Sequence, residues 1–259
     1  MDALNAIPLP LMTAAVFLFG LSIGSFANVC IHRMPRKESV VFPDSHCPSC
    51  NTPIRAFDNI PVISYLLLGG KCRSCNVKIS SVYPAIELAI AALITLCFLW
   101  FGPTVEFLIY GLVSATLVII TLIDLEHQII PDLITLPGIV FGLAAGCYLV
   151  GWQDSLLGFF LGGGLFYLLA VITRGGMGGG DIKYIAAAGA LMGWQKVLIV
   201  IFLGALLGSI IGLLLMALKG KTRKSLIPFG PFLAAATLIT IYFGDALIEF
   251  YLGLMTPGL

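Results

Sequence analysis

Two carboxylates stand beside long apolar segments of this sequence, where ionisable side chains are costly. Asp124 follows the apolar run 108–123, and Asp181 ends the glycine-rich segment 175–180. An ionised side chain at the centre of a membrane helix costs roughly 2.5–3.5 kcal/mol, so such residues usually mark function. Two carboxylates within hydrogen-bonding range at a partly dry site share one proton. One then acts as general base on water and the other as general acid, which predicts hydrolysis of a peptide bond.

The glycines before Asp181 need an explanation, because Gly-rich backbone at membrane depth is tolerated only beside protein or a water-filled cavity. We interpret them as leaving room for a substrate backbone, since glycine has no side chain to intervene. A phosphate cradle is disfavoured: Gly176-x-Gly178-x-x-Asp181 lacks the third glycine of a dinucleotide fingerprint, and no strand precedes it. The sequence also has no Gly-Lys-Ser/Thr, Gly-x-Ser-x-Gly or His-Glu-x-x-His.

Other readings of the acids remain open. Asp124 and Asp181 could pair structurally with a cation, Lys183 being the nearest in sequence, or could relay protons in a transporter. Glu126 and Asp132 could replace Asp124 as the active acid, although we interpret both as solvated or structural.

Glu87 follows Tyr83-Pro84 at a predicted helix start. There its charge would complement the helix dipole without any catalytic role.

A second constellation consists of four cysteines in a polar stretch. Cys47-x-x-Cys50 and Cys72-x-x-Cys75 form two C-x-x-C pairs, which predict a closed, structural zinc site. Two disulfides are the alternative, but we place this loop in the cytoplasm, where disulfides rarely persist. The adjacent His46 is expected to be a surface residue. The remaining cysteines lie in apolar segments and are interpreted as core residues: Cys30, Cys97 and Cys147.

The elements that position these residues are membrane helices. Of the 259 residues, 59% are hydrophobic and 10% charged, with a mean hydropathy of +1.05, which excludes an ordinary soluble domain. About 20 apolar residues cross a bilayer as a helix. We therefore predict an all-α polytopic protein of about eight transmembrane helices, with seven as the alternative. The predicted spans are 9–31, 84–101, 107–123, 133–151, 155–173, 184–195, 197–218 and 228–255. The sixth is too short alone and is expected to begin within the glycine segment.

The distribution of basic residues predicts the orientation. Residues 1–10 contain no Lys or Arg, so we expect span 9–31 to be a retained anchor with its N-terminus outside. With that orientation only Lys196 of the fourteen Lys and Arg residues lies outside, and both Asp124 and Asp181 reach the cytoplasmic face. The basic loop 219–224 is expected to contact anionic headgroups.

Three domains are expected: a first transmembrane helix (1–31), a cytoplasmic four-cysteine loop (32–83) and a transmembrane peptidase core (84–259). Small residues in the core indicate close helix packing: Gly158, Gly162, Gly204 and Gly208. We find no 20–50-residue internal repeat.

The chain resembles the bacterial type IV prepilin peptidases, or leader peptidase/N-methyltransferases, nearly from end to end. The matching pieces, in order, are Gly24-Ser25-Phe26-Ala27-Asn28-Val29 with Arg33 and Pro35, the double C-x-x-C loop, Asn59-Ile60-Pro61-Val62-Ile63-Ser64, Ile79-Ser80, Tyr83-Pro84-x-x-Glu87, Asp124-x-Glu126, Ile130-Pro131-Asp132, Thr135-Leu136-Pro137, Gly176-Met177-Gly178-x-Gly180-Asp181-x-Lys183 and Ile227-Pro228-Phe229-Gly230-Pro231. Each is modest alone, whereas their order and spacing are highly specific.

The resemblance implies an eight-helix inner-membrane aspartic peptidase of the Gly-x-Gly-Asp type, with Asp124 and Asp181 catalytic. It implies prepilins and type II secretion pseudopilins as substrates, cut after a glycine, and S-adenosylmethionine as donor for methylation of the new N-terminus. No Rossmann-like segment holds that donor, so the methyl-transfer region is expected in the cytoplasmic loop, including Asn59 to Gly70. Membrane lipids are expected contacts and nucleic acid is not; the oligomeric state stays open. The alternatives are a proton-coupled transporter and a non-catalytic pilus assembly factor.

Overall fold

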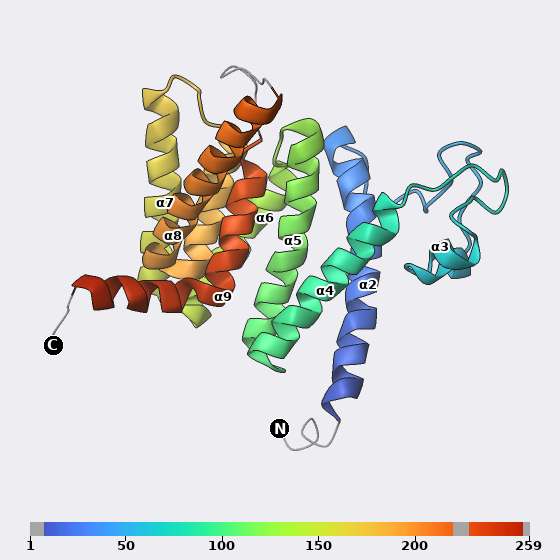
Figure 1. Cartoon of the computed structure of the whole chain (residues 1–259), viewed down its shortest axis with the longest axis horizontal. Coiled ribbons are helices and arrows are strands. Elements are labelled where there is room, and N and C mark those ends of the chain that lie inside the picture. The colour runs from blue at the N-terminus through green and yellow to red at the C-terminus, as the bar shows by residue number, and fades with distance from the viewer. Residues whose placement is uncertain (1–7, 220–227, 256–259) are drawn as a thin grey trace. The chain divides into compact units, whose positions relative to one another are not determined.

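In a computed structural model, which describes residues 8–219 and 228–255, the chain is almost entirely helical (Figure 1). Seven helices are long and apolar enough to cross a membrane. They are α2 (Leu9–Arg33), α4 (Val82–Phe101), α5 (Val105–His127), α6 (Asp132–Leu149), α7 (Trp152–Ile172), α8 (Gly179–Lys219) and α9 (Gly230–Met255). The loop between α2 and α4 holds the short elements η1 (Met34–Arg36), η2 (Ala56–Asn59) and α3 (Ile63–Leu67). The predicted all-α membrane architecture is confirmed.

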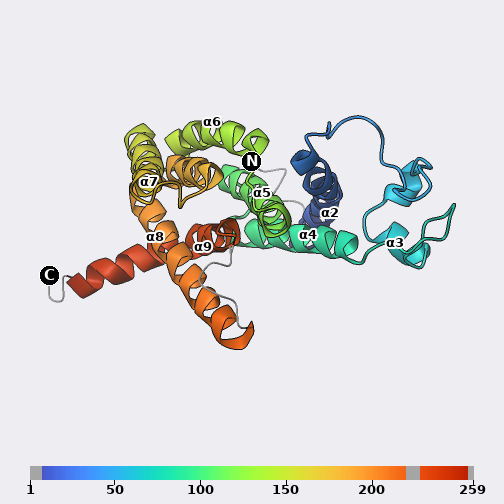
Figure 2. The same cartoon turned by 90° about the horizontal axis from the view of Figure 1, so that it is seen from above.

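Helix α8 contains two arms, and its chain reverses between them. Gly193 has φ +82° and ψ 172°, which is not helical. A Cβ placed on Gly162 would lie 2.8 Å from the carbonyl oxygen of Ile185 and 3.0 Å from a methyl of Val197. Twelve residues apart on one straight helix, those two groups would be separated by about 18 Å. The two arms therefore meet against Gly162 near the reversal, and the darker second arm leads away from the lighter first arm (Figure 2). They correspond to the predicted spans 184–195 and 197–218.

The chain divides into two compact units, Met1–Ile119 and Ile120–Leu259, and the boundary falls within α5. In the first unit, α2 and α4 cross with their backbones in contact. A Cβ on Gly20 would lie 2.8 Å from Ala91 Cα, and one on Gly24 would lie 2.6 Å from Glu87 Cα. Only glycine permits this approach, which brings the ends of α2 and α4 together at the four-cysteine loop.

In the second unit, the predicted small-residue packing is observed. Gly158 of α7 contacts the backbone of Gly189 in the first arm of α8, and Gly204 of the second arm packs on Leu233 of α9. Ser155 adds a buried hydrogen bond of 2.7 Å to the carbonyl of Ala190. Close approach of this kind replaces the hydrophobic driving force that helices lack inside lipid.

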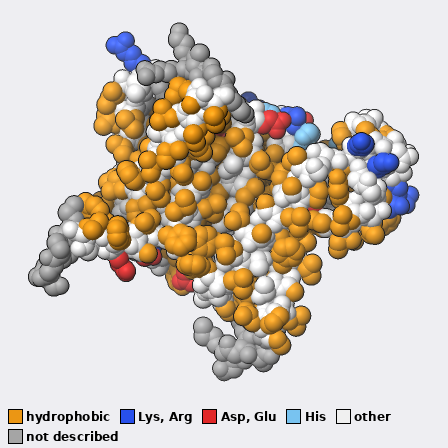
Figure 3. All heavy atoms as spheres, in the orientation of Figure 1, with side chains coloured by type: hydrophobic (Ala, Val, Ile, Leu, Met, Phe, Trp, Pro, Cys, Tyr) orange, Lys and Arg blue, Asp and Glu red, His pale blue; other side chains and the backbone are white. Residues whose placement is uncertain are grey.

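The surface fits a membrane environment. Large apolar side chains are exposed along the helices, whereas Lys and Arg side chains gather on the loop that carries α3 (Figure 3). Residues 220–227, which include most of the basic loop predicted to contact headgroups, lie outside the described residues.

The sequence-based explanation of Glu87 was wrong. Glu87 lies beyond the first turn of α4, too far along the helix for the dipole argument to suffice. Its Oε2 accepts a hydrogen bond of 2.7 Å from the backbone N–H of Val62, and Ser25 also bonds the carboxylate. Glu87 therefore ties α2, α4 and the loop together.

Candidate active site and metal centre

Asp124 lies in the last turn of α5, in the second unit, and its residue is only 5% exposed. Its Oδ2 accepts a hydrogen bond of 2.9 Å from the backbone N–H of Gly230, the first residue of α9. The carboxylate therefore faces a helix N-terminus, where free N–H groups and the dipole favour negative charge. A Cβ at position 230 would lie 2.6 Å from Oδ2, so only glycine leaves space for this contact.

Asp181 occupies the first turn of α8 and is held in a similar way. Its carboxylate accepts a hydrogen bond from the backbone N–H of Gly178, just before the helix begins. This is half of a capping box, in which a side chain in the first turn satisfies a donor that the helix leaves free. A Cβ on Gly178 would lie 2.8 Å from Asp181 Oδ2. Asp181 also interacts electrostatically with Asp124, which belongs to the same compact unit.

Two contacts bring the segment after Asp124 against the start of α8. A Cβ on Gly180 would lie 2.9 Å from Ile130 Cβ, so this glycine permits close packing. Lys183 Nζ forms an ion pair of 2.6 Å with Asp132 Oδ1 at the start of α6. Gly178 and Gly180 thus make room for the protein's own groups, whereas a Cβ on Gly179 would meet nothing within 4 Å. A substrate backbone can therefore use the space beside a glycine only where, as at Gly179, no group of the protein already occupies it.

The ion pairs also decide between the readings of the acids. Lys183 contacts Asp132 rather than Asp124 or Asp181, and within residues 8–219 and 228–255 neither of those two carboxylates is in an ion pair. Structural pairing with Lys183, one of the readings left open by the sequence, is therefore wrong. Glu126 is exposed, as expected of a solvated residue.

Two buried polar residues of this unit were given no role in the sequence analysis, although Thr135 belongs to one of the matching motif pieces. Tyr184, buried one turn after Asp181, contacts the Thr237 hydroxyl at 2.7 Å and donates to the Leu233 carbonyl at 3.3 Å. It thereby joins the first arm of α8 to α9. Thr135 is buried in α6, and its hydroxyl has no hydrogen-bond partner among the described residues. The i, i+3 spacing from Asp181 could have indicated Tyr184, and the motif piece Thr135-Leu136-Pro137 could have indicated Thr135.

The four cysteines converge in the first unit. The sulfurs of Cys47, Cys50, Cys72 and Cys75 all lie within 4.8 Å of one another, and Cys47 Sγ lies 3.9 Å from Cys75 Sγ. Tetrahedral Zn–S bonds of about 2.3 Å require sulfurs about 3.8 Å apart. The cluster therefore fits a metal ion bound by four thiolates. All four are free thiols, and His46 Nδ1 instead contacts the Asp44 carbonyl.

Each cysteine pair lies on a tight turn of the same design. The N–H of Asn51 bonds the Cys47 carbonyl and that of Asn76 bonds the Cys72 carbonyl, and both asparagines have positive φ. The sequences match as well: His46-Cys-Pro-Ser-Cys-Asn-Thr-Pro-Ile54 recurs 25 positions later as Lys71-Cys-Arg-Ser-Cys-Asn-Val-Lys-Ile79. This match of nine residues duplicates one cysteine turn and is much shorter than a 20–50-residue repeat unit.

The local environment favours the thiolate at two of the four cysteines, whereas burial and the neighbouring cysteines raise the pKa of the Cys75 thiol to about 11. The hydrogen bond with the Thr52 hydroxyl lowers the pKa of the Cys50 thiol to about 6. Backbone N–H groups of Cys75 and Ser74 lower the pKa of the Cys72 thiol. The thiolate is the form that binds metals.

Comparison with known proteins is consistent across the chain. Residues 18–101 match the bacterial peptidase A24 N-terminal domain, and residues 111–213 match the type IV leader peptidase family. A prepilin leader peptidase/N-methyltransferase of Pseudomonas aeruginosa is 36% identical, covering 97% of each chain. Proteins of the same name from Aeromonas salmonicida (37% identical, 92% of each chain) and Bacillus subtilis (33% identical, 93% of this chain and 98% of the relative) also match. No solved structure matches. With relatives above 30% identity over almost its whole length, the chain belongs to the prepilin leader peptidase/N-methyltransferase family.

Proposed function

We propose that this protein cleaves the leader peptides of type IV prepilins and type II secretion pseudopilins, with Asp124 and Asp181 as its catalytic carboxylates. We further propose that it methylates the new N-terminus from S-adenosylmethionine, in the inner membrane. The division into an anchor (1–31), a cytoplasmic loop (32–83) and a peptidase core (84–259) stays a prediction.

One observation carries the peptidase proposal. Asp124 and Asp181 interact electrostatically, each carboxylate is held by the N–H of a glycine at a helix start, and within the described residues neither forms an ion pair. Carboxylates that serve only for stability are normally paired when they are buried. A pair without a cation, kept in place by backbone donors, is the arrangement that acid-base hydrolysis requires.

The chemistry then follows from the protonation of the pair. One carboxylate, ionised, accepts a proton from a water molecule as that water attacks the scissile carbonyl carbon. The other, protonated, donates its proton to the carbonyl oxygen. When the C–N bond breaks, the first carboxylate passes the proton it took from water to the leaving amine, and the second takes back the hydroxyl proton as the carbonyl re-forms, which restores the pair. The N–H groups of Gly178 and Gly230 fix the orientation of both carboxylates beforehand, so no binding energy is spent on ordering them.

We propose that a prepilin reaches this site from the cytoplasmic face. The basic residues Arg174 and Lys183 flank the glycine segment, which supports a cytoplasmic location by the positive-inside rule. The chain reverses at Gly193, so both ends of α8 would face the cytoplasm if its first end does. An apolar helix of the substrate would lie in the bilayer with its polar leader in the cytoplasm. The scissile bond would then reach the depth of the two aspartates.

The four-cysteine cluster is proposed to hold a structural zinc ion, since four thiolates leave no open coordination position.

The methyl donor is proposed to bind in the surrounding loop, where it would supply an electrophilic methyl group to the new N-terminal amine. Asn59 lines a cavity in this region. Gly70 does not; it has φ +67°, and a Cβ there would lie 3.0 Å from the Tyr65 hydroxyl. The backbone conformation at position 70 and the nearby Tyr65 hydroxyl therefore explain why this residue is glycine, without any role in binding the methyl donor.

The direct test follows leader removal from a prepilin by mass spectrometry with purified protein. Asp124→Asn and Asp181→Asn are each expected to lower the cleavage rate by at least about 10²-fold, because amides can neither share nor transfer the proton. Glu126→Gln is the matched control, being an exposed carboxylate two residues from Asp124. Its rate should remain near that of wild type.

Three outcomes separate the alternatives. If both Asp→Asn variants cleaved at the wild-type rate, the peptidase assignment would be wrong and an assembly factor would fit better. Proton-dependent uptake of a solute that both variants abolish, without cleavage by wild type, would favour the transporter. Cleavage lost only in Glu126→Gln would move the catalytic role to that residue.

A further inference from the structure

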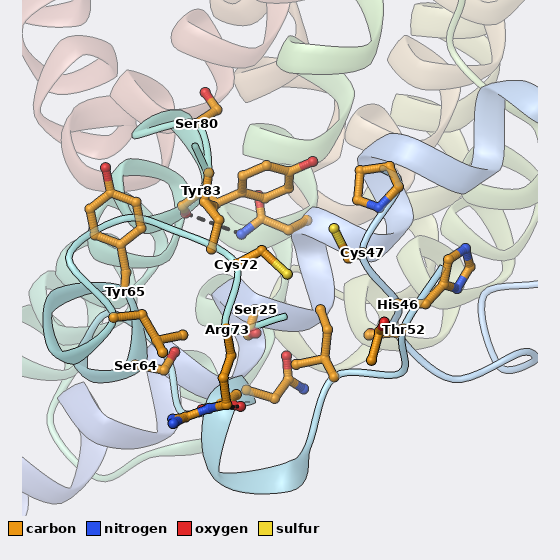
Figure 4. Close-up of a pocket in the computed structure, with 18 of the residues that line it drawn as sticks. Ser25, His46, Cys47, Thr52, Ser64, Tyr65, Cys72, Arg73, Ser80 and Tyr83 are labelled. Carbon is orange, nitrogen blue, oxygen red and sulfur yellow. Dashed lines mark hydrogen bonds and ion pairs between the residues drawn. The ribbon is translucent and has the colours of Figure 1, made fainter. Parts of the chain in front are cut away.

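A cavity of about 810 Å³ lies within the first unit, between the end of α2, the start of α4 and the four-cysteine loop. Figure 4 shows side chains from all three around it, including Ser25 of α2, Tyr83 of α4 and Tyr65 and Cys72 of the loop. Sites for small molecules commonly have volumes of about 300–1,000 Å³. The cavity therefore has the size of a cofactor site and lies outside the unit that holds the two aspartates.

The cavity contains a buried cation without a counter-ion. Arg33, at the end of α2, lines it and is only 8% exposed. Its guanidinium donates one hydrogen bond of 3.0 Å to the carbonyl of Ser39. None of the ion pairs in the described parts of the chain involves Arg33. A buried guanidinium is costly unless a carboxylate or phosphate neutralises it, and its fork of donors matches those groups in particular.

The same cavity contains a buried carboxylate, Glu87, that forms no ion pair within the described residues. Glu87 is also 8% exposed, and its hydrogen-bond partners, the Val62 N–H and Ser25, are neutral. Val62 has φ +61°, a conformation that is a genuine outlier for a β-branched residue. The bond to Glu87 holds this strained peptide in the cavity wall. Strain of this kind accumulates at sites that are preformed for a ligand.

The two unpaired charges lie too far apart for one small ion. Ser25, which bonds Glu87, and Arg33 are eight residues apart on α2, which corresponds to about 12 Å along the helix. The ligand must therefore carry a negative group at one point and a positive group some bonds away. Tyr65 and Tyr83 also line the cavity, and aromatic side chains of this type stack on base rings.

We propose that this cavity binds S-adenosylmethionine, with Arg33 binding its α-carboxylate and Glu87 facing its positively charged sulfonium. In this molecule Cα, Cβ and Cγ separate the carboxylate from the sulfur, which suits two anchors that are not adjacent. The transferable methyl group would lie beside Glu87 and Ser25. The inference rests on the proposed methyltransferase activity and specifies where its donor binds.

Calorimetric titration of the full-length protein in nanodiscs tests this with three ligands. S-adenosylhomocysteine lacks the sulfonium charge, and 5′-methylthioadenosine lacks the amino-acid carboxylate. Arg33→Gln is expected to weaken S-adenosylmethionine and S-adenosylhomocysteine by at least about tenfold but to leave methylthioadenosine unchanged, as for loss of a charged hydrogen bond. Glu87→Gln, whose amide oxygen can still accept from Val62, should weaken S-adenosylmethionine about tenfold and S-adenosylhomocysteine much less.

Lys37→Gln is the control, because Lys37 is an exposed cation four residues from Arg33 and does not line the cavity. Its affinities should equal those of wild type, and bound zinc per chain checks the fold of every variant. The proposal is overturned if Arg33→Gln binds S-adenosylmethionine as wild type does, if it weakens all three ligands equally, or if ATP binds as tightly. A wild-type protein that removes leaders but binds no S-adenosylmethionine would refute this site and leave the peptidase intact. A wild-type protein that binds S-adenosylmethionine but removes no leaders would support this site and refute the peptidase.

Discussion

The two compact units hold their polar residues in opposite ways. In the second unit, Asp124 and Asp181 are fixed by N–H groups at the starts of α9 and α8, between helices that approach through glycines. In the first unit, the charged residues belong to a cavity closed by an irregular loop, whose two cysteine turns converge on one point. Within apolar helices, helix ends are the main source of free backbone donors. Outside them, a loop with little core of its own needs a cross-link.

The largest effect is expected from removing that cross-link. Cys72→Ser leaves three sulfur ligands. Structural zinc binds with about 10–16 kcal/mol, and because the site forms only on folding, this binding free energy stabilises the folded loop. We expect bound zinc to fall from about one per chain to near zero, and a protease to cut within residues 37–81. Metal analysis and limited proteolysis measure both, with Cys147→Ser as control because Cys147 lies outside the cluster. A metal-free variant that resisted proteolysis as wild type does would show that the loop needs no cross-link.

In the second unit the corresponding change is a single methyl group. Gly230→Ala would place a Cβ 2.6 Å from Asp124 Oδ2, so the carboxylate must move from its N–H donor. We expect kcat for leader cleavage to fall about 10- to 100-fold, since displacements near 1 Å have effects of this order.

Gly164→Ala is the matched control for Gly230→Ala, because Gly164 lies in α7, outside the glycine segment, and a Cβ there meets nothing within 4 Å. It should cleave at nearly the wild-type rate. Equal rates for both alanine variants would contradict the role given to the Gly230 donor.

Local composition predicted much of this structure. Carboxylates and cysteines are rare in apolar sequence, so Asp124, Asp181 and the C-x-x-C pairs were recognisable without a structure, and the eight apolar segments all proved helical. Partners distant in sequence were not predictable. The bond from Val62 to Glu87 spans 25 residues and that from Gly230 to Asp124 spans 106. The pattern of apolar residues indicates which helix faces are buried. It does not indicate which polar atoms form hydrogen bonds after those faces have packed together.

A smaller effect is expected where a polar group serves only to join helices. Tyr184→Phe removes the hydroxyl that contacts Thr237 and the Leu233 carbonyl. The expected loss is about 1 kcal/mol of stability, a typical net value for a neutral hydrogen bond. Thermal unfolding in detergent should show a decrease of a few degrees, with Tyr167→Phe, an exposed residue, as control. A fall in kcat without any fall in stability would instead give Tyr184 a role in catalysis through Asp181.

The smallest effect is expected from an acid that lies close to Asp181 in the fold. Asp132 pairs with Lys183 at 2.6 Å, but the two side chains are 59% and 36% exposed, and exposed ion pairs contribute at most about 1 kcal/mol. Asp132→Asn should therefore change leader cleavage less than about fivefold. Lys183→Met should behave in the same way, because each variant removes only this pair. Cleavage abolished by Asp132→Asn but retained by Lys183→Met would mean that Asp132 acts on the substrate itself. Proximity to the glycine segment, rather than burial at a helix N-terminus, would then mark the active acid in this unit.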